Sequence, residues 1–335
     1  MQDFQAEKRR VRAFYDALEG ADALTVGKVF AEHCADDLTW HGYHPFGLIQ
    51  GRDNVAAQFW SHFLDAMRRV QRRQDIFFAG QNSLVDQDQV WVVSMGHLMA
   101  LFDQPWLGIR PNGKLVMLRY CEFNRVENDR IVETAFYFDI PHLMAQVGLN
   151  PFPHATAANL VQPGPRTHDG LLFDDAPADQ GPKTLAAINA MIGDLGTWQL
   201  GLPLEEELAR TWADDMLWWG PTGIGATYTI ERYAKQHSGP FRAAFYDRSG
   251  TGHIARLAEG HYGGFFGWPN FTAKHRGGFM GMPACDKDMA FNVIDIYRRE
   301  GDKLAENWIF IDLLGWMAQQ GNDVLGRMAT LYPAE

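Results

Sequence analysis

Hydrophobic positions along the first 140 residues recur first at helical spacing and then at strand spacing. Residues 6–18 place Val11, Phe14 and Leu18 on one stripe, which predicts an amphipathic helix. Two more helices are predicted over residues 23–30 and 53–67 by the same spacing. Apolar runs separated by turn residues then predict strands over residues 37–42, 74–78, 90–101, 114–125 and 130–139. Helices followed by strands are typical of an α+β unit in which a curved antiparallel sheet wraps around the helices.

The chain contains this unit twice. Residues 125–148 align with residues 298–321 without a gap, and 9 of the 24 positions are identical. Upstream, ADDLTWHG at residues 35–42 matches ADDMLWWG at residues 213–220. Because the period is about half the chain, the pattern indicates a tandem duplication rather than a short-period solenoid.

A proline-rich segment separates the two copies of the unit. Residues 151–182 hold six prolines and show no clear periodicity, which is typical of a linker packed over a surface. We therefore predict a first domain over residues 1–151, a linker over residues 152–180 and a second domain over residues 181–335. The first of these domains is called the first copy, and the other is called the second copy.

Composition and charge exclude several kinds of protein. The 335 residues are 46% hydrophobic and 21% charged, as in globular proteins, and the net charge is −11. Such an acidic chain is a poor partner for nucleic acid or for an anionic membrane. Three scattered cysteines give neither a disulfide framework nor zinc-ligand spacing, and the first 20 residues lack a signal-peptide core. A cytoplasmic location is the expectation.

Each copy ends an apolar strand on one acid. In FYFDIPHLMAQVG, Asp139 shares a strand face with Tyr137, and in IFIDLLGWMAQQG, Asp312 shares a face with Trp308. Burial among aromatic rings raises the pKa of a carboxyl, which suits a general base that removes a proton next to a carbonyl. Alternatively, each acid is the N-cap of the short helix that follows it.

Donors for an enolate are available elsewhere in the first copy. The pattern WHGYHP supplies His41 as a catalytic candidate, and the candidates for the substrate pocket are Tyr15, Trp40, His44, His97, Tyr120 and Tyr137. In the second copy, aromatic candidates for the pocket are Trp218, Trp219 and Trp308. His41 and His44 lack a third ligand at metal spacing, so no metal is expected.

Glu122 leaves two interpretations open. It lies one strand before the strand that ends on Asp139, and its counterpart in the second copy is Asp295. Glu122 either forms an ion pair with Arg119 or is a second acid of the pocket.

The repeated motifs carry a resemblance to a known family. DLTWHG with DRIVETAFYFDIPHLMAQVG, and DMLWWG with DKLAENWIFIDLLGWMAQQG, are similar to motifs of the SnoaL-like polyketide cyclases. These belong to the cone-shaped α+β proteins that include nuclear transport factor 2 and ketosteroid isomerase. The resemblance implies two cone-shaped α+β-barrel units. It also implies that Asp139 and Asp312 match the acid/base of a cofactor-free aldol ring closure. The second copy departs from the pattern in a glycine-rich insertion and in Trp219, where the first copy has His41.

Two functions are consistent with these observations. The first is a cofactor-free cyclase, isomerase, dehydratase or hydrolase that acts on a hydrophobic carbonyl compound. The second is a protein of the same fold that binds a hydrophobic small molecule without chemistry. In either case the two copies pair within one chain or the chain forms a homo-oligomer.

Overall fold

The structure is a computed structural model that describes residues 3–86, 88–197, 201–250 and 252–331. It divides into two compact units that are discontinuous in sequence. The N-terminal unit holds residues 3–79, 88–151 and 312–331, and the C-terminal unit holds residues 80–86 and the described part of 152–311. The domains expected from the repeat are continuous, whereas each compact unit includes a piece of the other copy.

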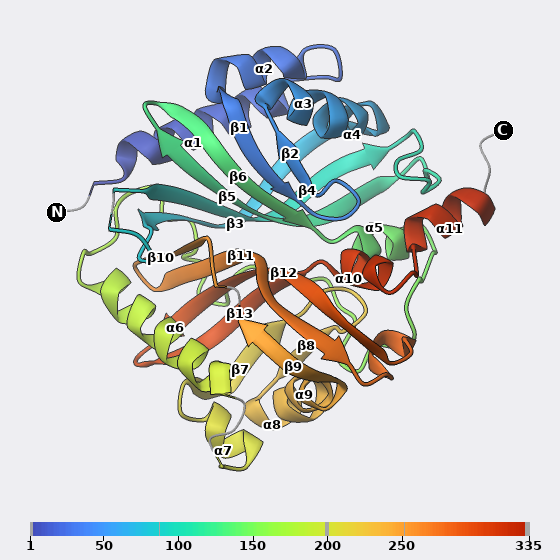
Figure 1. The fold of residues 1–335 in the computed structure, drawn as a ribbon. Helices are drawn as coiled ribbons and strands as arrows, with labels where there is room; N and C mark the ends of the chain where they lie inside the picture. The colour runs from blue at the N-terminus through green and yellow to red at the C-terminus, as the bar shows by residue number, and fades with distance from the viewer. Residues whose placement is uncertain (1–2, 87, 198–200, 251, 332–335) are drawn as a thin grey trace. The chain divides into compact units, whose positions relative to one another are not determined.

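The first copy begins with helices and continues with a sheet (Figure 1). Helices α1 to α4 lie over one face of a six-stranded sheet with the order β2-β1-β6-β5-β4-β3. The elements are α1 (Gln5–Glu19), α2 (Val26–His33), β1 (Cys34–Gly42), β2 (Leu48–Gln50), α3 (Arg52–Val55), a π-helical turn (Ala56–Trp60), α4 (Ser61–Ala66), β3 (Met67–Gln81), β4 (Val90–Phe102), β5 (Leu115–Glu127), β6 (Arg130–Phe138) and α5 (Ile140–Gln146).

The second copy repeats this order. Its seven-stranded sheet has the order β10-β11-β12-β13-β7-β8, with β9 paired to β11. The elements are α6 (Gln180–Thr197), α7 (Leu204–Leu208), β7 (Trp212–Trp219), β8 (Ala226–Tyr228), α8 (Ile230–Tyr233), a π-helical turn (Ala234–Ser238), α9 (Gly239–Ala244), β9 (Phe245–Gly250), β10 (Ala255–Glu259), β11 (Tyr262–His275), a 3₁₀ turn (Phe279–Gly281), β12 (Cys285–Glu300), β13 (Lys303–Ile311), α10 (Leu313–Gln319) and α11 (Val324–Leu331).

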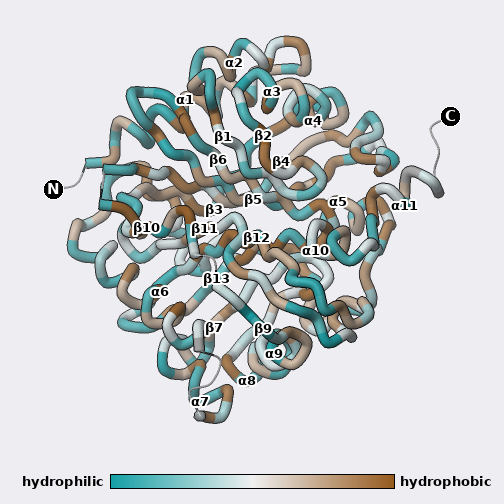
Figure 2. Tube along the Cα trace, viewed as in Figure 1, coloured by the Kyte–Doolittle hydropathy of each residue, from teal (hydrophilic) through white to brown (hydrophobic). Residues whose placement is uncertain are grey.

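These sheets confirm the expected α+β units. Each sheet is mixed, because β1 pairs with β6 in parallel and β7 pairs with β13 in parallel. The outer helix α1 is mostly hydrophilic along its length (Figure 2), and it buries Val11, Phe14 and Leu18 toward the sheet. The predicted stripe is therefore the buried face of this helix.

The two copies correspond residue by residue from β1 and β7 to the start of β3 and β9. In both, a four-residue helix, a five-residue π-helical turn and a six-residue helix come one after another without a break. Arg69 and Asp247, at matching positions of β3 and β9, both have a positive φ, 59° and 49°. This alignment allows the interiors of the two copies to be compared side chain by side chain.

Candidate functional site

A cavity of about 310 Å³ lies in the C-terminal unit. Its lining comes from the inner face of the sheet, the helices that cover it and the π-helical turn. The polar side chains among the lining residues are Tyr233, His237, Ser238, Arg242, Arg248, His253, Arg256, Asn270, Asp295, Tyr297 and Asn307. The apolar part of the lining includes Trp212, Trp218, Phe241, Phe265, Phe271 and Phe291. An aromatic cavity with a few polar groups is the usual form of a small-molecule site.

Smaller side chains open this cavity in the second copy. The first copy has Phe59, Trp60 and Phe136 where the second has His237, Ser238 and Ile309. Ring centroids of Phe59 and Phe136 lie 5.6 Å apart, and those of Trp60 and Phe136 lie 5.7 Å apart. In the first copy these rings therefore occupy the space that corresponds to part of the cavity.

A charged side chain fills a further part of the first copy's interior. Arg72 of β3 stands where β9 has Gly250. Its Nη1 lies 2.7 Å from Oε2 of Glu122, and both side chains are almost fully buried. The guanidinium also lies over the rings of Tyr15, at 3.7 Å, and Tyr120, at 4.5 Å. Burial lowers the pKa of Arg72, but the carboxylate of Glu122 and the two phenols raise it more.

Asp295 is the acid of the cavity. It lies on β12 at the position of Glu122, and it is 6% exposed. Burial raises the pKa of its carboxyl to about 7, against hydrogen bonds from Asn307 and Tyr297 that lower it. The amide Nδ2 of Asn307 donates to Oδ1 of Asp295 at 3.0 Å. A carboxyl with a pKa near neutrality exists in both protonation states at physiological pH, as acid/base catalysis requires.

Two phenols surround this carboxyl. Burial, followed by the charge of Asp295, raises the pKa of Tyr233 and of Tyr297 above the usual value. Both hydroxyls therefore remain protonated at neutral pH and are able to donate a hydrogen bond.

A neutral histidine completes the polar group. His237 stacks on Trp218 with ring centroids 3.9 Å apart, and burial lowers its pKa to about 3. Its Nδ1 is buried and has no hydrogen-bond partner among the described residues. Because such an atom is costly to bury unpaired, it is available to bond to a ligand or to a water molecule in the cavity.

The acids predicted from the strand ends are helix caps. Asp139 accepts from the backbone N–H of His142 at 3.1 Å, and Asp312 accepts from that of Gly315 at 2.9 Å. Asp312 also accepts from the N–H of His44 at 3.1 Å, and burial raises its pKa to about 7. Neither acid is among the residues that line the cavity. The helix-cap alternative is thus confirmed for both, and a catalytic role for either stays a prediction.

The cap of α10 gives a testable expectation. Asp312→Ala removes the acceptors of two backbone N–H groups, and we expect it to lower the free energy of unfolding by about 2 kcal/mol. Asp312→Asn keeps one acceptor and is expected to cost less. Urea unfolding of both variants at pH 5, below the pKa of about 7 at which ionisation of this buried carboxyl lowers stability, measures the difference, and equal losses would contradict the capping role.

The other predicted residues of the first copy belong to its core or its ion pairs. Trp40 is buried against Phe59 with ring centroids 5.2 Å apart. The remaining contacts are His41 Nε2 to Glu133 Oε1 at 3.0 Å, His97 Nδ1 to Asp75 Oδ2 at 3.6 Å, Ser94 Oγ to Tyr120 Oη at 2.8 Å, Asn124 Nδ2 to Tyr15 Oη at 2.9 Å, and the rings of Tyr137 and Tyr43 at 6.4 Å. Glu122 pairs with Arg72 rather than with Arg119, and a role for Glu122 as a second acid stays a prediction.

Of the three tryptophans predicted for the pocket of the second copy, only Trp218 lines the cavity. Trp308 donates from Nε1 to the carbonyl of Pro163 at 2.9 Å, and Trp219 lines a separate surface hollow. The cavity face of β13 carries Asn307, Ile309 and Ile311 instead. The alternation along β13 is therefore as expected, but the opposite face meets the cavity.

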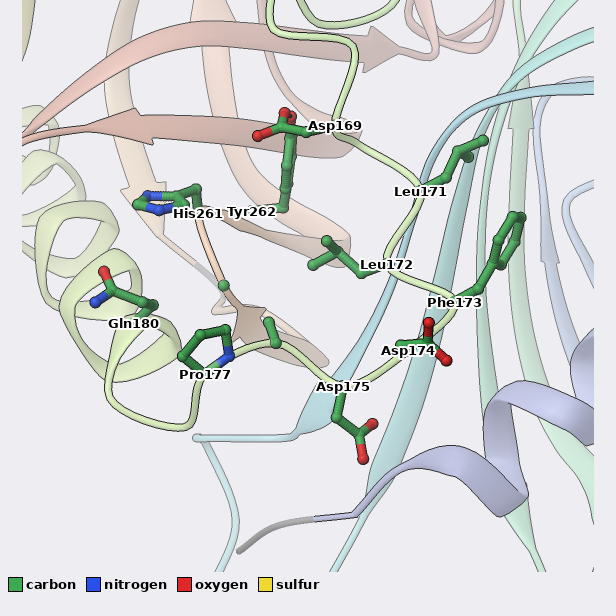
Figure 3. Close-up of a pocket in the computed structure, with 12 residues that line it drawn as sticks. Asp169, Leu171, Leu172, Phe173, Asp174, Asp175, Pro177, Gln180, His261 and Tyr262 are labelled. Carbon is green, nitrogen blue, oxygen red and sulfur yellow. Dashed lines mark hydrogen bonds between the residues drawn. The ribbon is translucent and has the colours of Figure 1, made fainter.

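A second, more open pocket of about 590 Å³ lies where the linker crosses the second copy (Figure 3). Three of its polar side chains already have partners. The hydroxyl of Tyr262 donates to Asp169 at 2.5 Å, and Arg299 contacts Nδ1 of His261 at 3.3 Å. We interpret it as a place where the linker is attached rather than as a reaction site. Across the described residues, no cluster of three His, Cys, Asp or Glu side chains is arranged to hold a metal ion.

Comparison with known families agrees with the architecture. The family "SnoaL-like domain" matches residues 11–134, and the family "SnoaL-like polyketide cyclase" matches residues 268–320. Each half of the chain therefore contains a region that matches a SnoaL-like family, and the two regions fit a tandem arrangement of two such domains. No curated protein matches the chain.

Three solved structures similar to this chain each cover less than half of it. A candidate SnoaL-like polyketide cyclase from Jannaschia Sp. CCS1 is 17% identical, with a TM-score of 0.35, over 45% of this chain and 95% of its own. A candidate polyketide cyclase from Streptomyces antibioticus is 19% identical, with a TM-score of 0.32, over 42% and 97%. An NTF2-like protein of unknown function from Burkholderia pseudomallei k96243 is 18% identical, with a TM-score of 0.30, over 42% and 95%. Separately, none of the helices in the described residues has the length and apolar character needed to cross a membrane.

Proposed function

We propose that the protein is an enzyme of the SnoaL-like cyclase and isomerase type, and that its reaction takes place in the cavity of the second copy. The observation that supports this most strongly is Asp295, a buried carboxyl with a pKa of about 7 on the wall of an aromatic cavity. The substrate is a hydrophobic compound with an acidic C–H next to a carbonyl. Asp295 takes that proton as a carboxylate and returns it as a carboxylic acid.

Neighbouring side chains assist both the carboxylate that removes the proton and the enolate that then forms. Asn307 holds the carboxylate by a hydrogen bond of 3.0 Å, which limits its rotation. Protonated Tyr233 supplies a donor for the enolate oxygen, as in an oxyanion hole, while the hydroxyl of Tyr297 donates to Asp295. A cofactor is not needed for this chemistry, because the enolate forms and collapses by proton transfer alone. The first copy, with its interior filled by Arg72 and aromatic rings, serves as a structural partner.

Hydrogen–deuterium exchange tests the proton transfer without knowledge of the final product. Flat aryl ketones with an α C–H, such as 2-acetylnaphthalene and 1-tetralone, are first screened for binding by thermal shift. Ligands that bind are then incubated in D₂O, and deuterium at the α carbon is followed by mass spectrometry. We expect the protein to accelerate exchange, and Asp295→Asn to reduce the rate by about 100-fold or more.

Asp139→Asn is the matched variant, because Asp139 is the acid that the sequence motif suggests. We expect it to retain exchange within a few-fold of the unaltered protein. If Asp139→Asn lost exchange while Asp295→Asn kept it, the reaction would have to be assigned to the first copy instead. Binding without exchange in the unaltered protein would support the alternative of a small-molecule binding protein, and absence of binding would exclude this class of ligand.

A further inference from the structure

Positive charge is concentrated in the lining of the cavity. Three arginines, Arg242, Arg248 and Arg256, line it together with one acid, Asp295. The charge of Arg242 is balanced by Glu207, which accepts from both Nη atoms at 2.6 and 3.1 Å. Asp295 balances at most one more charge, and it is protonated for part of the time because its pKa is about 7.

Arg256 donates to neutral acceptors. Its Nη1 donates to Oδ1 of Asn189 at 2.7 Å, and its Nε and Nη2 lie 3.3 and 3.0 Å from Nδ1 of His253. His253 stacks on Phe265 at 3.9 Å, and burial together with the two nearby arginines lowers its pKa to about 3. It is therefore a neutral acceptor, and no carboxylate contributes to the contacts described for Arg256.

The backbone fixes Arg256 in place. Its N–H donates to Oδ1 of Asn82 at 3.1 Å, and its carbonyl accepts from the N–H and hydroxyl of Ser83 at 2.8 and 2.9 Å. These partners come from residues 80–86, which belong to the C-terminal unit although they lie in the first copy of the sequence. A guanidinium on a fixed edge strand is preorganised to bind a ligand.

Arg256 and Asp295 share one row across the sheet. Arg256 pairs with Phe265, Phe265 pairs with Asp295, and Asp295 pairs with Ile309. Directly paired residues point to the same face, and all four line the cavity. Two strand spacings separate the Cα atoms of Arg256 and Asp295 by about 10 Å. The row thus has a base near its centre, an aromatic ring next to it and a cation at its edge.

We propose that the substrate carries a carboxylate, which Arg256 binds while Asp295 acts on a carbon farther along the same molecule. The place of the reaction in this proposal rests on the proposed function, whereas the binding of the carboxylate by Arg256 does not. A planar guanidinium matches a carboxylate through two parallel hydrogen bonds. A dianionic phosphate fits less well, because Asp295 on the same row repels a second negative charge. Arg248, whose guanidinium lies 4.6 Å from the ring centre of Phe271, adds to the positive potential of the cavity.

Paired ligands test the anion site by affinity alone. The probes are 4-(2-naphthyl)-4-oxobutanoate, a flat aryl ketone with a carboxylate, and its primary amide, which has nearly the same shape and no charge. Isothermal titration calorimetry at pH 8 gives the ratio of their dissociation constants. We expect the acid to bind at least 10-fold more tightly than the amide. Equal affinity, or preference for the amide, would overturn the proposal.

Two variants test whether Arg256 is the source of the preference for the acid over the amide. In Arg256→Gln we expect the ratio to fall below about 3, whereas Arg210→Gln, which removes an exposed arginine paired with Asp194, should leave it unchanged. If Arg256→Gln does not fold, Asn189→Ala provides the test, because it alters only an exposed support of the guanidinium and should reduce the ratio. A preference that persists in whichever variant folds would place the anion elsewhere and overturn the assignment to Arg256.

This measurement is separate from the test of proton transfer. Asp295→Asn is titrated with the same two ligands, and we expect it to keep the preference for the acid. Acid preference without α-proton exchange would retain the anion site and reject the enzyme. Exchange without acid preference would retain the enzyme and reject the anion site.

Discussion

Asp295→Asn is expected to stabilise the C-terminal unit at pH 8 while it removes the proposed base. The carboxyl of Asp295 has an ordinary pKa of 3.8 and a pKa of about 7 in the fold. The folded protein therefore holds this proton more tightly than the unfolded chain does. Its contribution to stability is complete below pH 3.8 and is lost as the pH rises to about 7. A difference of about three pH units corresponds to about 4 kcal/mol, which is an upper bound for a single group.

Asparagine keeps the shape and the acceptor oxygen but cannot ionise. We therefore expect the variant to match the unaltered protein near pH 4 and to unfold at a higher temperature at pH 8. Thermal unfolding followed by circular dichroism at the two pH values measures this. Asp312 has a raised pKa as well, so its contribution changes in the same direction in both proteins and cancels in the comparison.

An exposed acid provides the control for this prediction. Asp214 lies on β7 with its side chain in solvent, and Asp214→Asn should unfold at nearly the same temperature as the unaltered protein at both pH values. A gain for Asp295→Asn that is the same at pH 4 and pH 8 would contradict the assignment, because it would not arise from ionisation. A gain confined to high pH would show that stability is given up to place an acid in the cavity.

Arg72→Met is expected to destabilise the N-terminal unit by about 3 to 5 kcal/mol, the usual cost of removing one partner from a buried ion pair. Arg72 and Glu122 are 4% and 2% exposed in their side chains, so the remaining carboxylate would be left without its counter-ion and away from water. Urea unfolding followed by tryptophan fluorescence gives the change in free energy.

The double variant Arg72→Met with Glu122→Leu should recover most of this loss, because no charge then remains to be buried. The control is Arg10→Met, which removes an arginine from an ion pair with Asp129, whose side chain is 72% exposed. We expect that change to cost less than about 1 kcal/mol. If Arg10→Met and Arg72→Met cost the same, the filled interior of the first copy does not depend on its buried charges.

The fold could be predicted from the sequence, because its signals are local or repeated. The apolar stripe of α1 lies within a single helix, and the motif FYFD recurs as IFID. The structure confirms the stripe as a buried helix face and the motif as a repeated strand end. The helix caps at Asp139 and Asp312 could be predicted for the same reason, since an N-cap bonds to a residue three positions later.

The position of the cavity depends on contacts between distant segments. Alternation separates the two faces of β13 but does not say which one meets the cavity, so the sequence predicts Trp308 in the lining where the structure has Asn307 and Ile309. The motif is also kept more closely in the first copy, which suggested that copy as the site. The available signal was the alignment of Phe59 with His237 and of Arg72 with Gly250, where a large side chain is replaced by a smaller one.

The exchange of segments between the copies affects any attempt to divide the chain. Residues 80–86 from the first copy hold the edge strand that carries Arg256, and residues 312–331 from the second copy supply the carboxylate that binds the N–H of His44. A protein cut within the linker would give two fragments that each lack a segment of their own unit and carry a segment of the other. Single-domain expression is therefore a poor route to either cone, whereas co-expressed fragments have a reason to reassociate. We therefore expect a chain cut within the linker to stay folded only while both fragments are present.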